Sequence, residues 1–225
     1  TEHSHGNDNV YALSNLVLMT GHLGAASMGL NPLRGQNNVQ GANDAGATPI
    51  FYPGYQRVDD EAVRKKYEAA WGVDLDPNPG LNLNEMMKVA GTTIRAMFIM
   101  GEDIVMSEPN ISHLEEGLNN MDFLVLQDIF PNETMRFTDV VLPAACFAEK
   151  DGVFVNSERR MQRVRKAVEP PGQARADWEI LVSLFAAAGT PLESQTVSEI
   201  FTEMTSLAPK FAGITYEHIE KLGHG

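Results

Sequence analysis

Apolar residues recur at three- and four-residue intervals along much of this chain, which is the spacing of an amphipathic helix. In residues 9–20, for example, Val10, Leu13 and Val17 fall on one face. Similar patterns, several of them ended by glycine, predict a series of further helices. These cover residues 59–71, 84–90, 109–120, 132–137, 177–188, 194–207 and 215–222.

Three short apolar runs interrupt this helical pattern, at residues 94–100, 123–126 and 140–142. They are nearly continuous in apolar residues, as expected of strands buried on both faces. With helices between them and short links, they predict a parallel α/β unit. We therefore expect an α/β fold whose core is a Rossmann-like parallel sheet with flanking helices.

Polar residues follow two of these predicted strands directly. Gly101, Glu102 and Asp103 come after the first strand, and Gln127 and Asp128 follow the second. Ligands of parallel sheets bind beyond the carboxyl ends of the strands, and a buried amide such as Gln127 needs partners that a ligand can supply. Asp103 has two interpretations, because it could bind a ribose or guanine or could cap a helix.

A stretch crowded with amides and glycines fits neither a helix nor an alternating strand. It reads Asn31-Pro-Leu-Arg-Gly-Gln-Asn-Asn-Val-Gln-Gly41, and its proline and glycines predict a loop. The amides offer donors and acceptors, and Arg34 adds a positive fork suited to a carboxylate or phosphate. A solvated polar loop is the plainer interpretation. The flanking apolar segments and Tyr52-Pro-Gly-Tyr55 favour a ligand cradle.

Composition narrows the classes of protein that fit this pattern. With 43% hydrophobic residues the chain can bury a substantial core, and its formal net charge of -13 argues against nucleic-acid binding. No apolar run approaches the ~18 residues of a membrane span. The single cysteine, Cys146, excludes an internal disulfide and a multi-cysteine metal site and fits a cytoplasmic protein. Glycine-rich nucleotide motifs are absent, which argues against an ordinary nicotinamide site.

Three smaller features have competing interpretations. His3 and His5 could bind a metal, but no third ligand is near in the sequence. Cys146 lies in apolar surroundings, so a buried structural thiol is favoured over a nucleophile or a metal ligand. The basic run 158–166 is either a solvated face or a clamp for cofactor phosphates or another domain.

In its motifs the chain resembles the catalytic (alpha) subunits of molybdenum- or tungsten-dependent formate dehydrogenases, within the molybdopterin oxidoreductase superfamily. The resemblance covers nearly the whole chain, and the Arg-Gly-Gln-Asn-Asn run narrows it to formate dehydrogenases. Beyond the amide-rich stretch, it rests on Thr20-Gly-His-Leu-Gly24, Tyr52-Pro-Gly-Tyr-Gln56, Met100-Gly-Glu-Asp103, Gln127-Asp-Ile-Phe130, Asp139-Val-Val-Leu-Pro143, Glu149-Lys-Asp-Gly152 and Asn156-Ser-Glu-Arg-Arg160. Two departures are Asn43, where the family often has Cys, and His22, where Asn is usual.

The resemblance implies reversible two-electron oxidation of formate to carbon dioxide at a molybdenum or tungsten centre. Two molybdopterin guanine dinucleotides hold that metal in each full-length subunit of the family. Arg34 would be the catalytic residue that orients formate. The implied cofactor-binding residues are Gln36, Gly101, Glu102, Asp103, Ser107, Gln127 and Asp128. The family's metal-ligating cysteine or selenocysteine and its 4Fe-4S cysteines lie upstream, so no metal ligand is expected in this chain.

The family's subunits are longer on both sides, so the chain is expected to be an internal fragment that is inactive alone. Its expected partners are the other domains of the same subunit and electron-transfer subunits with iron–sulfur clusters. We predict that residues 1–37 end a neighbouring α/β domain, that 38–148 form a Rossmann-like cofactor-binding domain and that 149–225 form a basic segment plus helices. Two alternatives are a cofactor-binding module without activity and a sibling oxidoreductase such as a nitrate reductase.

Overall fold

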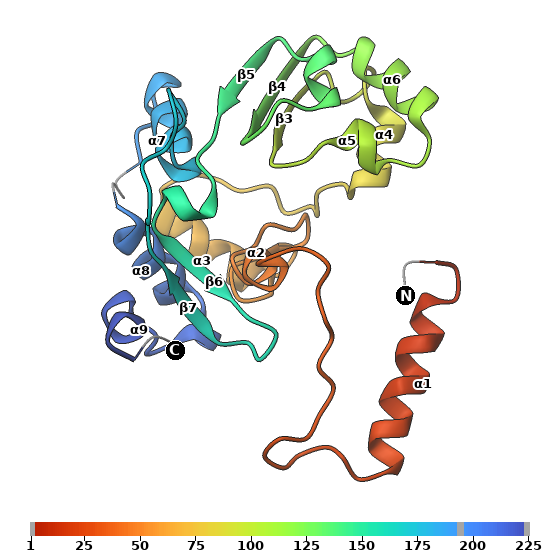
Figure 1. Ribbon diagram of the computed structural model, residues 1–225, viewed down its shortest axis with the longest axis vertical. Helices are drawn as coiled ribbons and strands as arrows, with labels where there is room; N and C mark the ends of the chain where they lie inside the picture. The colour runs from red at the N-terminus through yellow and green to blue at the C-terminus, as the bar shows by residue number, and fades with distance from the viewer. Residues whose placement is uncertain (1–2, 193–195, 223–225) are drawn as a thin grey trace.

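A parallel sheet of three strands forms the core of one half of the fold (Figure 1). The computed structural model describes residues 3–192 and 196–222. Strand β4 (Phe123–Asp128) lies in the middle, between β3 (Ala96–Met100) and β5 (Val140–Pro143). Met100 pairs with Gln127 in register, so the carboxyl ends of β3 and β4 meet at one edge. The α/β fold and all three strands predicted from the apolar runs are confirmed.

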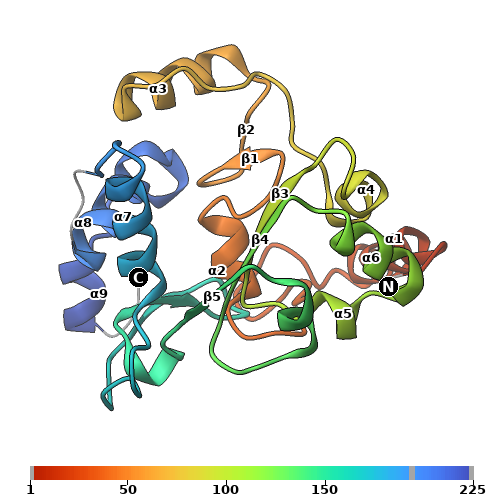
Figure 2. The same cartoon turned by 90° about the horizontal axis from the view of Figure 1, so that it is seen from above.

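Helices cover one face of this sheet. They are α4 (Leu83–Val89), α5 (Ile104–Ser107) and α6 (Ile111–Asn119), which lie on the same side in both views (Figures 1 and 2). The core between helices and sheet consists of Met87, Ile99, Ile104, Val105, Leu114, Leu118, Leu124 and Leu126. Burying each of these side chains contributes about 1.5–3 kcal/mol. The sequence predicted α4 and α6, but α5 is too short to show a helical period.

The opposite face of the sheet is open in the described part of the chain. Phe98, Phe123 and Val140 are exposed on it and line an apolar hollow of about 490 Å³ beside Leu184. The strands were expected to be buried on both faces, and that expectation is wrong for this chain. Alternate side chains of a strand point to opposite faces, so only the half that meets the helices is covered.

Capping residues set the ends of two helices within two residues of their predicted bounds. Asp60 accepts hydrogen bonds from two backbone N–H groups at the start of α3 (Glu61–Trp71), and Gly72 ends that helix at φ 67°. Asn82 and Glu85 form a reciprocal capping box at the start of α4. These ends were predictable because a cap acts on backbone groups only two or three residues away.

The other half of the fold packs helices against a hairpin of β6 (Gly152–Val155) and β7 (Met161–Val164). The helical elements are α8 (Val197–Leu207), the short 3-10 helix η3 (Pro209–Phe211) and α9 (Tyr216–Leu222). Their shared core consists of Val155, Met161, Phe201, Ala208, Phe211 and Ile219. The start predicted for the helix over 194–207 lies partly outside the described residues.

The hairpin was not predicted, because the basic run that contains β7 hides its alternation. Arg163 is nearly buried within that strand, with its guanidinium carbon 3.8 Å from the ring centroid of Tyr216. It forms ion pairs with Asp151 and Glu220. Arg165 pairs with Glu220 as well. These two arginines therefore hold the hairpin to α9, so this part of the basic run is not a freely solvated face. The interpretation of the run as a clamp for cofactor phosphates or another domain stays a prediction.

Helix α1 (Gly6–Met19) confirms the first predicted helix but not its burial. Figure 1 shows it clear of the other helices, at the end of an extended segment. Leu13 and Leu16, which share the apolar face given by the helical period of residues 9–20, are 55% and 57% exposed. A helical period identifies an apolar stripe, but it does not supply the surface that covers the stripe.

Helix α7 (Asp177–Ala187) confirms another predicted helix. Trp178, Leu181 and Val182, which its helical period predicts to lie inward, are half-buried. Ile180 is its fully buried residue, whereas Phe185, which the same period places inward, is 45% exposed. Ile111, which the helical period of residues 109–120 places inward on α6, is likewise 49% exposed. The remaining short elements are α2 (Val39–Asp44), β1 (Phe51–Tyr52), β2 (Gln56–Arg57), η1 (Glu133–Phe137) and η2 (Phe147–Glu149). None of the helices in the described ranges has the length and apolar character to cross a membrane.

Candidate functional site

The amide-rich loop runs into helix α2 earlier than the sequence suggested. Residues up to Gly41 were predicted to be loop, but α2 begins at Val39. Asn38 precedes the helix in a left-handed conformation, at φ 61°. A Cβ on Gly41 would lie 2.1 Å from the Asn38 Oδ1 atom, so the Asn38 amide occupies the space that glycine leaves free. Gly41 thus accommodates a folded-back side chain and does not end the loop.

Asn38 also joins the loop to the hairpin. Its Oδ1 accepts a hydrogen bond of 2.9 Å from the backbone N–H of Val155 in β6. The bond spans 117 positions in the sequence. It brings the end of the loop against the turn that follows β6.

A Gly41→Ala substitution tests this connection. The added methyl group is expected to displace the Asn38 amide and to expose the Val155 N–H, whose exchange with solvent should become about tenfold faster. Melting temperature should change little, because alanine favours a helix over glycine by about 1 kcal/mol and offsets the lost bond. Gly35→Ala is the matched control, since its methyl group would meet no atom within 4 Å. Unchanged exchange at Val155 in Gly41→Ala would contradict the role of Asn38.

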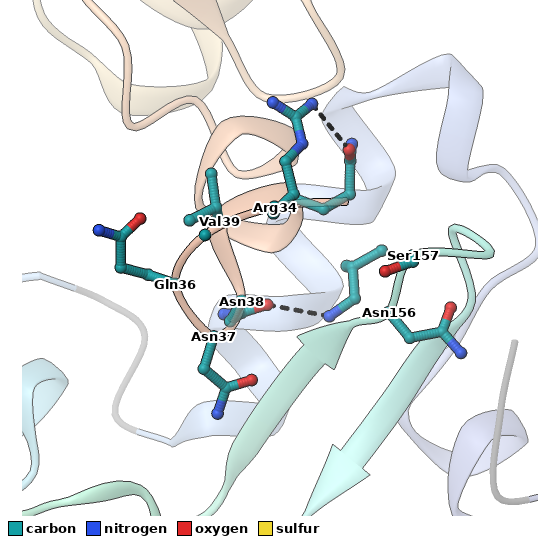
Figure 3. Close-up of a pocket in the computed structure, with 10 residues that line it drawn as sticks. Arg34, Gln36, Asn37, Asn38, Val39, Asn156 and Ser157 are labelled. Carbon is teal, nitrogen blue, oxygen red and sulfur yellow. Dashed lines mark hydrogen bonds between the residues drawn. The ribbon is translucent and has the colours of Figure 1, made fainter. Parts of the chain in front are cut away.

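The loop, α2 and the turn after β6 enclose a hollow of about 350 Å³ (Figure 3). Its lining consists of Arg34, Gly35, Gln36, Asn37, Asn38, Val39, Gln40, Val155, Asn156 and Ser157. The structure therefore brings Arg34 and Gln36 to one hollow, although their side chains point in different directions (Figure 3). Amides dominate the polar lining, so the hollow offers donors and acceptors around one guanidinium.

Asn156 and Ser157 were not among the predicted site residues. They belong to the motif Asn156-Ser-Glu-Arg-Arg160, which was noted for its resemblance only. The Asn156 Oδ1 accepts backbone N–H bonds from Glu158 and Arg160, each of 3.0 Å, and so shapes the turn. The motif was the signal that could have placed this turn in the site.

Arg34 is exposed, and its guanidinium is held from one side. Its Nη2 atom donates to Gln40 Oε1 at 3.1 Å, the bond drawn from Arg34 in Figure 3. Gln40 Nε2 in turn donates to Asp44 Oδ1 at 2.9 Å and to the Tyr55 hydroxyl at 3.1 Å. The guanidinium is a five-donor group, so this single bond leaves donors for an anion in the hollow.

The second group of predicted residues lies at the carboxyl edge of the sheet. The Gly101 N–H donates to the Gln127 carbonyl at 2.8 Å, and Ser107 Oγ donates to Glu102 Oε1 at 2.5 Å. Asp128 accepts from the Ile129 N–H and from Asn132 Nδ2. These residues are neighbours, as the strand order predicted. They do not line the hollow that contains Arg34.

Gln127 is fully buried at this edge. Its Nε2 donates to Asp177 Oδ1 at 2.6 Å, and Asp177 also pairs with Lys150. Its Oε1 has no hydrogen-bond partner among the described residues. A buried acceptor without a partner is costly, so this atom is suited to a donor from a ligand. Asp177 and Lys150 were not predicted, because each reaches Gln127 through tertiary packing.

Asp103 has partners within the fold. It accepts hydrogen bonds from the Thr134 hydroxyl at 2.7 Å and from the backbone N–H groups of Glu133 and Thr134 at 3.2 Å. Burial raises the pKa of the Asp103 carboxyl, but these bonds outweigh burial and hold the pKa below its ordinary value. Asp103 thus ties β3 to the start of η1, a structural task beside its predicted contact with guanosine.

The described residues do not place His3, His5 or Cys146 in a metal site. Within the described ranges, no three His, Cys, Asp or Glu side chains gather as a metal site. His3 Nδ1 accepts from the exposed His5 N–H at 3.3 Å. Cys146 is half-buried, and its N–H donates to Glu149 Oε2. The expected fully buried thiol is therefore a half-buried one.

Comparison with known proteins places this geometry in context. The pattern of the family described as molybdopterin oxidoreductase matches residues 1–187. The chain is 49% identical over 98% of its length to the F420-dependent formate dehydrogenase subunit alpha of Methanocaldococcus jannaschii, of which it covers 33%. It is 40% identical over 99% of its length to formate dehydrogenase H of Escherichia coli, of which it covers 32%. The chain thus spans about a third of the length of these relatives.

A likeness among solved structures is weaker. Acetylene hydratase from Pelobacter acetylenicus is 21% identical, with a TM-score of 0.49. The likeness covers 74% of this chain and 24% of the hydratase.

Proposed function

Because this chain belongs to the molybdopterin oxidoreductase family, we propose that it is part of the catalytic subunit of a formate dehydrogenase. The whole subunit would oxidise formate reversibly to carbon dioxide. Relatives named as formate dehydrogenases, at 40% and 49% identity over nearly the whole chain, support this choice within the family. Formate and carbon dioxide would be the small-molecule partners.

The observation that supports the proposal most directly is the hollow around Arg34. Formate is a small planar anion, and a guanidinium can hold both of its oxygens through parallel N–H bonds. Arg34 lies at the wall of the hollow with donors left over, and amides supply most of the remaining polar lining. Arg34 would orient formate and leave its C–H bond directed away from the guanidinium.

A molybdopterin guanine dinucleotide suits the carboxyl edge of the sheet. The buried, partnerless Oε1 of Gln127 matches the N–H donors on the edge of a guanine base. We propose that the cofactor contacts Gln36, Gly101, Glu102, Asp103, Ser107, Gln127 and Asp128. When bound, two such cofactors supply the molybdenum or tungsten centre that accepts two electrons. Iron–sulfur clusters in other parts of the enzyme would carry the electrons onward.

The direct test uses the purified full-length enzyme with a redox dye. Formate should reduce the dye, and nitrate should not re-oxidise the reduced dye. An enzyme that consumes nitrate and ignores formate would overturn the proposal in favour of a nitrate reductase. Metal and pterin analysis of the same sample distinguishes molybdenum from tungsten and counts the cofactors.

The 225-residue chain by itself is expected to give no formate-dependent dye reduction. The reason is that catalysis would need the metal centre, for which the family resemblance places the ligand outside this chain. The assay compares the purified chain with the full-length enzyme at equal molar concentration. Formate turnover by the isolated chain above the rate of a heat-treated sample would contradict this prediction.

A further inference from the structure

We propose that Gln40 is a positioning residue that sets the orientation of the Arg34 guanidinium toward the substrate. The proposal rests on the proposed function, in which Arg34 binds formate. Gln40 also lines the hollow, yet both N–H donors of its amide and its carbonyl oxygen bond to protein groups. Its effect on the reaction would therefore pass through Arg34.

The orientation of the Gln40 amide is set from both ends. Asp44 is 7% exposed, and an ionised carboxylate has only acceptors to offer. The Nε2 side of the amide must therefore face Asp44, as it does at 2.9 Å. This leaves Oε1 to face Arg34, which has only donors. A flipped amide would set donor against donor at one end and acceptor against acceptor at the other.

The anchor points of Gln40 are more firmly held than the loop that contains Arg34. Gln40 and Asp44 lie one turn apart on α2. The Tyr55 hydroxyl receives the second Nε2 bond at 3.1 Å, and the Tyr55 ring meets Phe51 edge-on with centroids 5.6 Å apart. An exposed arginine loses rotamer freedom when it is ordered. The bond to Gln40 orders the Arg34 side chain in the free protein, so this entropy is already lost before substrate binds.

The decisive variant is Gln40→Met in the full-length, cofactor-loaded enzyme. Methionine keeps the length of the side chain but removes both the acceptor for Arg34 and the donor for Asp44. The turnover number with formate should fall about 10- to 100-fold, the equivalent of one hydrogen bond to a charged group. A loosely held guanidinium also binds a planar anion less tightly. We therefore expect a higher dissociation constant for nitrate, a planar anion used as a probe. This constant is measured from nitrate-induced shifts in melting temperature. Gln162→Met, at an exposed position on β7, is the matched control and should change neither value.

A second pair of variants separates positioning from packing. Asp44→Asn removes the constraint on the amide and should also lower turnover. Adding Gln40→Glu to Asp44→Asn rebuilds an acceptor for Arg34, held by the amide donor that the substitution introduces at position 44. This double variant should recover most of the turnover that Asp44→Asn loses. Recovery is not expected if position 40 serves only to stabilise α2.

The results distinguish this inference from the proposed function. If Arg34→Lys turns formate over normally, the role of Arg34 fails and the proposal for Gln40 fails with it. If Arg34→Lys loses activity while Gln40→Met keeps it, only the positioning role is overturned. If Gln40→Met loses metal or has a lowered melting temperature, the double variant Asp44→Asn, Gln40→Glu provides the test. A double variant with normal metal content that does not recover turnover counts against the positioning role. Gln40→Met added to Arg34→Lys should cause little further loss, because both changes remove the same contact.

Discussion

An Arg34→Lys variant of the full-length enzyme is expected to keep its fold and cofactors and to lose about 30- to 1000-fold in formate turnover. Lysine retains the positive charge but lacks the planar fork that holds two oxygens at once. It also cannot reproduce the fixed geometry of the bond to Gln40 at 3.1 Å. If Arg34 aligns formate in the transition state, the turnover number should fall and not only the affinity.

The measurement is steady-state kinetics with formate, preceded by metal analysis, pterin analysis and a melting curve. Arg34 is exposed, so its replacement should leave the melting temperature within the scatter of the wild type. Arg57→Lys is a matched control, because Arg57 is also exposed and pairs with Asp59 outside the hollow. Full metal loading with near-normal turnover in Arg34→Lys would make Arg34 a scaffold residue.

An Asp103→Ala variant is expected to lose about 2–4 kcal/mol of stability, because it leaves buried polar groups without their acceptor. The Thr134 hydroxyl is fully buried and donates to Asp103, and the same hydroxyl accepts from the Val105 N–H. Removing the carboxylate therefore disturbs both α5 and η1. The melting temperature of the enzyme, compared with wild type at neutral pH, measures this loss.

The Asp103 contribution should also depend on pH. Its folded-state pKa is lowered, so its stabilisation is present above the unfolded pKa of about 4 and is lost as pH falls through the folded value. The difference in stability between wild type and Asp103→Asn should therefore shrink as the pH drops below about 4. A difference that stays constant into acid would show that the hydrogen bonds do not depend on the ionised carboxylate.

Cofactor content separates the structural task of Asp103 from its predicted contact with guanosine. Thr134→Val serves as the control, because it removes one of the Asp103 bonds but leaves the carboxylate available to a ligand. If Asp103 contacts the cofactor, Asp103→Ala should lose more pterin than Thr134→Val after both are compared at equal folded fractions. Normal pterin content in Asp103→Ala would contradict the cofactor assignment.

Elements that depend on neighbours in the sequence were predictable in this chain. The continuous apolar runs located β3, β4 and β5, because strand pairing in a parallel sheet follows from apolar strands linked by helices. Gly72 marked the end of α3 because a helix-ending glycine acts on backbone groups within a single turn. The starts of α3 and α4 were predicted to within one or two residues. The placement of Gly101 and Gln127 at one sheet edge followed from the same rule of parallel strands.

The assembly of the site depends on contacts between segments that are distant in the sequence. Asn38 reaches Val155 across 117 positions, and this contact brings Asn156 and Ser157 beside Arg34. No local period records such a contact, because its energy depends on two segments that meet only after folding. The burial of Arg163 hid the hairpin for the same reason, since a charged residue reads as surface until Tyr216, Asp151 and Glu220 surround it.

Local periodicity and residue chemistry thus predicted the α/β core, the approximate positions of the longer helices and an amide-rich loop with one arginine. Tertiary packing set which face of each helix is covered, where the loop becomes helix α2, and how Asp44 and Tyr55 hold the Gln40 amide that bonds to Arg34. The physical reason is that burial and hydrogen-bond partners belong to the packed chain and not to any single stretch of it.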